Sequence, residues 1–142
     1  MEVSMNTKEA LVELSKLLGS FIIHPQFLVE MSGLLKKELK GKEASFFTTL
    51  TTQLNNLNNF GPMIYTVDSH EQLKGADGHY YSIHLQKNQF NVRFIVHISA
   101  MSEISLLCAF YERSGKSSTD YSRYTSVMVQ RFNELKGDDM ND

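Results

Sequence analysis

The fold is decided by three apolar runs, Tyr80-Tyr81-Ser82-Ile83-His84-Leu85, Asn91-Val92-Arg93-Phe94-Ile95-Val96-His97-Ile98 and Ile104-Ser105-Leu106-Leu107-Cys108-Ala109-Phe110-Tyr111. β-Branched and aromatic residues dominate all three, and the breaks between them are short and polar, which is typical of strands joined by hairpins. The pattern predicts an antiparallel meander. The middle strand carries one charge, Arg93, and an unpaired buried guanidinium is costly. We therefore expect Arg93 to reach solvent, an ion-pair partner or a functional site.

The totals fit a single domain covering residues 1–142, with a net charge of −2 from 14 Lys and Arg against 16 Asp and Glu. One cysteine, Cys108, excludes an internal disulfide and predicts a buried, inert thiol in a reducing compartment. No apolar run has the length of a membrane span, and Glu2 and Glu9 make the N-terminus acidic. We expect a soluble, cytoplasmic protein with no membrane partner.

Helical periodicity frames the three strands. It predicts helices over residues 6–18, 25–40 and 43–59 and a last helix marked by Tyr121, Tyr124, Val127, Met128, Phe132 and Leu135. Asn6 and Glu9 have the spacing of a capping box. A short strand is predicted at 20–24, an extended segment at 63–67 and a disordered acidic tail at 137–142.

These elements predict an α+β fold in which a small antiparallel sheet packs against a helical hairpin formed by residues 25–40 and 43–59. The helix at residues 1–19 and the C-terminal helix are additions to this unit. The first helix has an apolar stripe that needs a covering surface, which is either the domain itself or a second copy of the chain in a homodimer.

No P-loop, dinucleotide-binding fingerprint, metalloprotease helix or serine elbow is present, and the five histidines lack a metal-ligand spacing. No cofactor or metal is therefore predicted. The remaining polar residues gather around the sheet: Lys74, His84, Arg93, His97, Tyr111, Arg113 and Lys116. Arg93 and His97 are four apart on one strand, so both point to one face, and His84 could share that face across the hairpin.

This set suits cleavage of an RNA phosphodiester. The reaction needs a group to take the 2′-hydroxyl proton, a cation beside the phosphate and a donor for the leaving oxygen. Histidine and tyrosine can move protons, and arginine and lysine stabilise the phosphate charge. The alternative interpretation is a scatter of polar residues on the solvated face of the sheet. Four lysines at residues 36–42 have the same two interpretations, a helix C-terminus facing solvent or a phosphate-contacting edge.

The order strand, helical hairpin, three antiparallel strands and terminal helix resembles the RelE/ParE superfamily of toxins from toxin–antitoxin systems, and most of all its HigB-like, phage-derived branch. The matching stretches are Gly61-Pro62, Leu73-Lys74-Gly75, Tyr81-Ser82-Ile83-His84, Val92-Arg93-Phe94-Ile95-Val96 and Leu106 to Lys116. The resemblance covers residues 21–135. This chain has His84 where the family usually has arginine, and it lacks the family's basic net charge.

The resemblance implies a metal-independent endoribonuclease that cleaves mRNA on the ribosome and is blocked by a cognate antitoxin protein. By position, Arg93 matches the family's strand arginine, which clamps the scissile phosphate, and Lys74 and Lys116 match basic residues of the family, which we expect to bind RNA. The polar set around the sheet adds His84, His97 and Tyr111 as catalytic candidates and Arg113 as an RNA-binding one. Two alternatives stay open. One is a non-catalytic protein-binding module of the same fold, and the other is a ParE-like toxin that targets gyrase.

Overall fold

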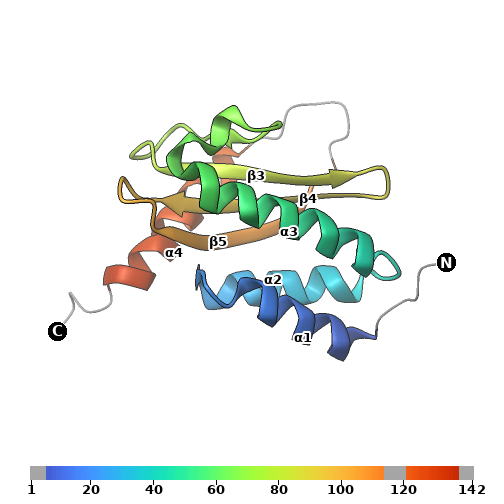
Figure 1. Cartoon of the computed structure of the whole chain (residues 1–142). Helices are drawn as coiled ribbons and strands as arrows, with labels where there is room; N and C mark the ends of the chain where they lie inside the picture. The colour runs from blue at the N-terminus through green and yellow to red at the C-terminus, as the bar shows by residue number, and fades with distance from the viewer. Residues whose placement is uncertain (1–5, 114–120, 138–142) are drawn as a thin grey trace.

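The computed structural model describes residues 6–113 and 121–137, which form an α+β fold with four α-helices and a five-stranded mixed sheet (Figure 1). The elements, in chain order, are α1 (Thr7–Leu18), β1 (Ile22–Ile23), α2 (Pro25–Lys36), α3 (Glu43–Phe60), η1 (Gly61–Thr66), β2 (Glu71–Gln72), β3 (Tyr80–Lys87), β4 (Phe90–Ile98), β5 (Ile104–Tyr111), η2 (Ser122–Tyr124) and α4 (Thr125–Gly137). The predicted tail lies almost entirely outside the described residues.

The strand order is β1-β5-β4-β3-β2. The meander β3–β4–β5 is antiparallel, as predicted, and β2 adds an antiparallel edge to β3. The prediction of a wholly antiparallel sheet is wrong, because β1 pairs in parallel with β5 through Ile22 opposite Ser105. The long connection between these strands runs through several helices, and a crossover of that length allows a strand to rejoin the sheet in the same direction.

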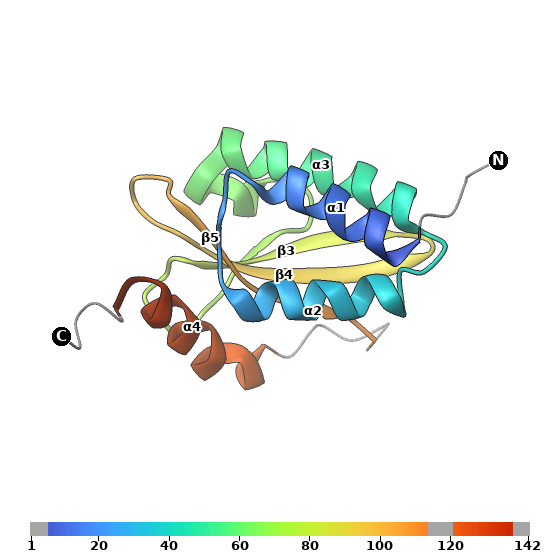
Figure 2. The same cartoon turned by 90° about the horizontal axis from the view of Figure 1, so that it is seen from below.

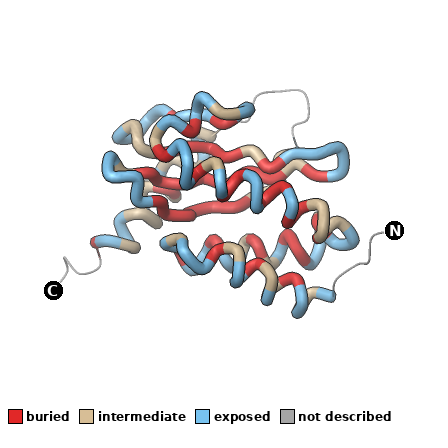
Figure 3. The backbone as a smooth tube through the Cα atoms, viewed as in Figure 1, coloured by how far each residue is buried: buried red, intermediate tan, exposed pale blue. Residues whose placement is uncertain are grey.

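The sheet separates two apolar clusters. The larger cluster joins one face of the sheet to α1, α2 and α3, with Phe27 and Phe94 in edge-to-face contact at its centre. The smaller cluster joins the other face to α4 through Leu107, Cys108 and Met128. Figure 2 shows α1 and α3 on one side of β3 and β4 and α4 on the other, whereas α2, which packs on β5, is drawn between α1 and α4. Figure 3 shows that the strands are mostly buried, whereas the turn between β3 and β4 is exposed.

The helix ends follow their local sequence, with two corrections. Asn6 and Glu9 form the predicted capping box at the start of α1. The second helix ends at Lys36, earlier than predicted, and its connection to α3 contains Gly41 at a φ of 82°. Residues 61–66 form the 3-10 helix η1, so the predicted extended segment is wrong. Pro62 has a φ that suits the first turn of a helix, and a short apolar run does not distinguish helix from strand.

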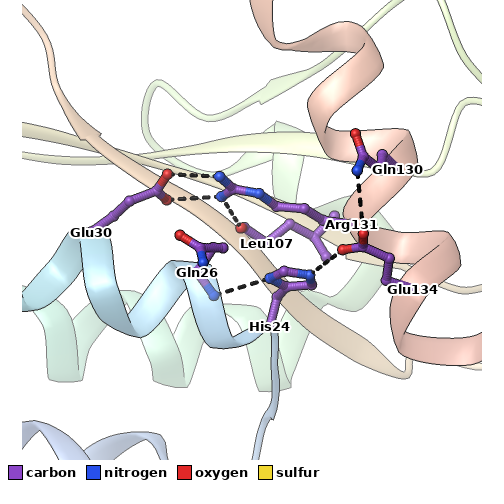
Figure 4. A network of polar contacts seen from close by, with 7 residues as sticks. All are labelled: His24, Gln26, Glu30, Leu107, Gln130, Arg131 and Glu134. Atoms are coloured by element: carbon purple, nitrogen blue, oxygen red, sulfur yellow. Dashed lines mark hydrogen bonds and ion pairs between the residues drawn. The ribbon is translucent and has the colours of Figure 1, made fainter.

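A polar network fixes α4 to the sheet and to α2 (Figure 4). Nη1 and Nη2 of Arg131 donate to the carboxylate of Glu30, at 3.0 and 2.9 Å, and Nη1 also donates to Leu107 O at 2.8 Å. Glu30 accepts a further bond from the backbone N–H of Ala109 at 2.9 Å. These bonds satisfy backbone groups on the edge of β5 that β1 does not reach.

Burial raises the pKa of Cys108 to about 12, which supports the prediction of an inert thiol. In the part of the chain that the structure describes, no helix has both the length and the apolar character needed to cross a bilayer.

Candidate functional site

The candidate site lies on the face of the sheet that α4 partly covers, where opposite residues of β3 and β4 form successive cross-strand pairs. Directly opposite residues of an antiparallel pair point to the same face. From α4 outward, the pairs on this face are Tyr80–His97, Ser82–Ile95, His84–Arg93 and Gln86–Asn91. The first pair packs against Phe132 of α4, whereas the third brings together two predicted site residues. The strands therefore carry polar groups out from beneath α4 toward the exposed hairpin.

The His84 imidazole is held at both nitrogens. Its Nε2 lies 2.9 Å from Glu71 Oε2, and its Nδ1 lies 3.1 Å from Ser69 Oγ. A carboxylate only accepts, so the neutral ring carries its proton on Nε2 and accepts from the Ser69 hydroxyl. Burial lowers the pKa of His84, as does the nearby charge of Arg93, and the contact with Glu71 opposes them. The ring is therefore neutral at pH 7.

Tyr121 adds a hydroxyl to the same cluster. Its OH lies 2.6 Å from Ser82 Oγ, 3.2 Å from Glu71 Oε2 and 3.5 Å from His84 Nε2. Tyr121 precedes η2, and Glu71 comes from the edge strand β2, so two segments 50 residues apart meet over β3. One carboxylate oxygen thus accepts from an imidazole and a phenol. The side chain of Glu71 is 47% exposed and its Oε1 has no partner among the described residues, so a ligand can approach it.

A second histidine holds the backbone of this cluster. His70 Nδ1 accepts from the backbone N–H of His84 at 2.9 Å, and its Nε2–H donates to Gln53 Oε1 at 2.6 Å. Gln53 in turn donates to Asp68 at 2.9 Å. Burial, aided by the nearby His84, lowers the pKa of His70 to about 4. This neutral ring connects α3 to the edge of β3 and fixes the position from which His84 projects.

Arg93 supplies the positive charge of the site. The residue is 7% exposed, and its Nη1 donates to Asn91 Oδ1. Its Nε has no hydrogen-bond partner, and none of the described carboxylates forms an ion pair with it. A buried donor without a partner costs free energy. The Nε lies beneath the surface, so Arg93 acts on an anion beside His84 through its positive charge.

Two other predicted catalytic residues lie elsewhere. His97 shares the face of Arg93, as the spacing predicts, but four residues separate them, about 13 Å along a strand. Its ring stacks on Phe132 at 3.6 Å under α4. Tyr111 lies opposite Val92 and packs with the larger apolar cluster, on the face of the sheet that α1, α2 and α3 cover. The structure therefore brings His84 and Arg93 together and leaves His97 and Tyr111 apart from them.

The predicted RNA-binding residues are also dispersed. Lys74 is exposed in the loop between β2 and β3. The Arg113 guanidinium pairs with Glu38 and lies 5.1 Å from the centre of the Tyr111 ring. Lys116 lies outside the described residues.

Sequence reasoning missed Glu71, Ser69, His70 and Tyr121 as site residues. The first three belong to a polar loop whose contact with β3 depends on a two-residue strand with no apolar signal. Tyr121 has the spacing of a helix residue, but α4 begins only at Thr125.

Within residues 6–113 and 121–137, no group of three or more His, Cys, Asp or Glu side chains is arranged to hold a metal ion. Comparisons of the chain with protein-family models, curated proteins and solved structures found no match. The interpretation of the site therefore depends on its geometry and chemistry.

Proposed function

We propose that this protein is the toxin of a toxin–antitoxin pair, a RelE/ParE-type endoribonuclease that cleaves mRNA through its own acid–base groups. One observation carries the proposal: His84 and Arg93 form a cross-strand pair, and the Glu71 carboxylate and the Tyr121 hydroxyl both lie within 3.5 Å of the His84 ring. A cation, a carboxylate and two proton-bearing groups are the components that RNA transesterification requires. A strand, two helices, three antiparallel strands and a terminal helix follow one another in the chain, which supports the proposal. Two features depart from the predicted unit, because β2 is inserted before the three strands and α2 and α3 contact α1 more than each other.

The reaction is an attack of the ribose 2′-oxygen on the adjacent phosphorus. The bond from phosphorus to the 5′-oxygen breaks, and the products are a 2′,3′-cyclic phosphate and a 5′-hydroxyl. One proton leaves the 2′-hydroxyl and one is given to the 5′-oxygen, so no proton is gained or lost overall. The negative charge that develops on the phosphorus oxygens needs a cation that is already in place.

The geometry suggests a role for each group. Glu71 takes the 2′-hydroxyl proton on its unpartnered Oε1, while His84 and Tyr121 orient the carboxylate through Oε2. Tyr121, whose OH lies 3.2 Å from Glu71 Oε2, gives its proton to the leaving oxygen. After the products leave, Glu71 releases its proton to solvent and Tyr121 takes one from solvent, so the enzyme returns to its starting state. Arg93, which is 7% exposed, attracts the phosphate through its positive charge. His84 is in this scheme a positioning residue for the base.

The test is cleavage of end-labelled mRNA by the purified chain, with and without ribosomes, followed by detection of 2′,3′-cyclic phosphate ends. Glu71→Gln removes the base and should lower the rate about 100-fold or more, whereas Glu13→Gln on α1 makes the same change away from the site and should leave it unaltered. Arg93→Ala should abolish cleavage and restore growth to cells that express the chain. The proposal is wrong if the unaltered chain cuts neither free nor ribosome-bound RNA.

The implied partners are a cognate antitoxin, the ribosome and mRNA. A non-catalytic binding module would co-purify with a partner and leave mRNA intact, and a gyrase-targeting toxin would alter DNA supercoiling without cutting RNA. The same purified protein serves in all three assays.

A further inference from the structure

The cross-strand pair beyond His84–Arg93 carries two amide side chains. Gln86 lies opposite Asn91 on the same face of the sheet. Gln86 is exposed, and Asn91 is half-buried and accepts from Arg93 through its Oδ1. Amides offer both donors and acceptors, so this pair extends the site with groups that can recognise the hydrogen-bonding edge of a planar ligand.

A hollow opens beside this pair, between α3 and the β3–β4 turn. Its lining consists of Ser45, Ser69, Gln86, Lys87, Asn88 and Gln89. All six side chains are polar and none is acidic. Ser69 also contacts His84 Nδ1 at 3.1 Å, so the hollow adjoins the site at this serine. A ligand that extends from His84 past Ser69 would enter the hollow.

Two lysines lie at the hollow although the whole chain is slightly acidic. Lys87 is exposed in the turn. Lys42 Nζ donates to Gln89 O at 2.9 Å, which brings the α2–α3 connection, with Lys37 and Lys40, to the same end of the molecule. Phosphate affinity depends on such local lysines more than on net charge.

We propose that this hollow is a subsite for the nucleotide next to the scissile phosphate of a single-stranded RNA. The inference rests on the proposed function and specifies its substrate. Gln86 and Asn88 hydrogen-bond to the base edge, which is accessible only in an unpaired strand, and Lys87 contacts the following phosphate. The amides thus make the subsite sensitive to base identity, and the lysine adds affinity for any sequence.

The test is binding, by fluorescence anisotropy, of short 2′-O-methyl oligoribonucleotides, one homopolymer for each base, which lack the attacking 2′-hydroxyl. Lys87→Ala should weaken all four about threefold to fivefold and reduce the slope of log affinity against log salt by about 0.7. Gln86→Ala should weaken the preferred homopolymer about fivefold more than the others. The matched controls are Lys16→Ala and Gln26→Ala, exposed positions on α1 and α2, and thermal unfolding checks that every variant is folded.

The inference is overturned if the two hollow variants bind like their controls, or if the unaltered chain binds none of the oligonucleotides. Its failure is distinct from failure of the proposed function. RNA that is cut at the normal rate while binding ignores Gln86 and Lys87 would refute the subsite alone. Base-dependent binding that requires both residues, with no cleavage of unmodified RNA, would support the subsite and refute the nuclease.

Discussion

His70→Asn should make the stability of this protein less sensitive to pH. The native ring accepts from His84 N at 2.9 Å and donates to Gln53 at 2.6 Å, and only the neutral imidazole can do both. Burial is the main cause of its lowered pKa, about 4 in place of 6.5. Protonation would put a charge in a buried position and remove the acceptor for the His84 amide.

The direction in which stability changes with pH depends on whether the folded or the unfolded state binds the His70 proton more readily. In the unfolded chain His70 has the ordinary pKa of 6.5, so between pH 6.5 and about 4 the unfolded state binds more protons. Stability is therefore fully present above pH 6.5 and falls as the pH is lowered toward 4. The difference between 6.5 and about 4 corresponds to about 3.4 kcal/mol in total, of which about 1.8 kcal/mol is lost between pH 7 and 5. Solvent screening reduces the expected loss to about 1 kcal/mol.

The assay is urea unfolding followed by circular dichroism at pH 7 and pH 5. Asparagine can still accept from the His84 amide but does not titrate. We expect His70→Asn to cost about 1–2 kcal/mol at pH 7, because the bond to Gln53 is lost, and to lose about 1 kcal/mol less than the unaltered protein on acidification. His79→Asn is the matched control, since His79 is less buried and its Nδ1 bonds Ile98 O at 3.1 Å.

The reasoning would be refuted if His70→Asn and the unaltered protein lost equal free energy between the two pH values. That result would mean that His70 is charged or solvated in the native state. His70 would then not link Gln53 of α3 to the backbone N–H of His84, and another contact would have to hold His84 in place.

Three further substitutions test the fold. Glu30→Ala should cost about 2 kcal/mol in urea unfolding, because it leaves the half-buried Arg131 without its carboxylate, whereas Glu13→Ala on α1 should stay within about 0.5 kcal/mol. Gly61→Ala should destabilise by about 1–2 kcal/mol in thermal unfolding, because φ is 52° and the new Cβ would lie 2.7 Å from a hydroxyl oxygen. Gly33→Ala, inside α2 with nothing within 4 Å, should stabilise by about 0.5–1 kcal/mol, and a loss would contradict this account of α2.

Local patterns were enough to predict the helices and the meander. The three central strands match the predicted runs to within two residues at each end, because alternation and β-branched residues carry a strong local signal. The capping box at Asn6 was predicted from the three-residue spacing of Asn6 and Glu9, which is also a local signal. The parallel pairing of β1 was not predicted, since it joins residues about 80 positions apart and two residues carry no directional information.

The candidate site was predictable only in part, because faces of a sheet depend on register. His84 and Arg93 could be placed together from the hairpin, and their pairing agrees. Tyr111 was assigned to the same set from its position at the end of the third strand. It pairs with Val92 and faces α1, α2 and α3 instead. A one-residue change of register moves every side chain of a strand to the opposite face. Sequence patterns place strand boundaries with an error larger than one residue, so they do not determine the face. Glu71 reaches the site through tertiary pairing that no local pattern signals.

The incomplete hydrogen bonding of Arg93 suggests that this residue serves function and not stability. The larger apolar cluster, beneath α1, α2 and α3, contains most of the buried apolar side chains. The smaller cluster beneath α4 does not include Arg93 either. A buried guanidinium whose Nε has no partner destabilises the free protein by about 1–3 kcal/mol, and no described carboxylate offsets this. Such a local conflict is expected at a functional site, where the fold accepts a cost for a charge that a ligand needs. An anion beside His84 would offset that buried charge, and in the proposed function a backbone phosphate of RNA is that anion.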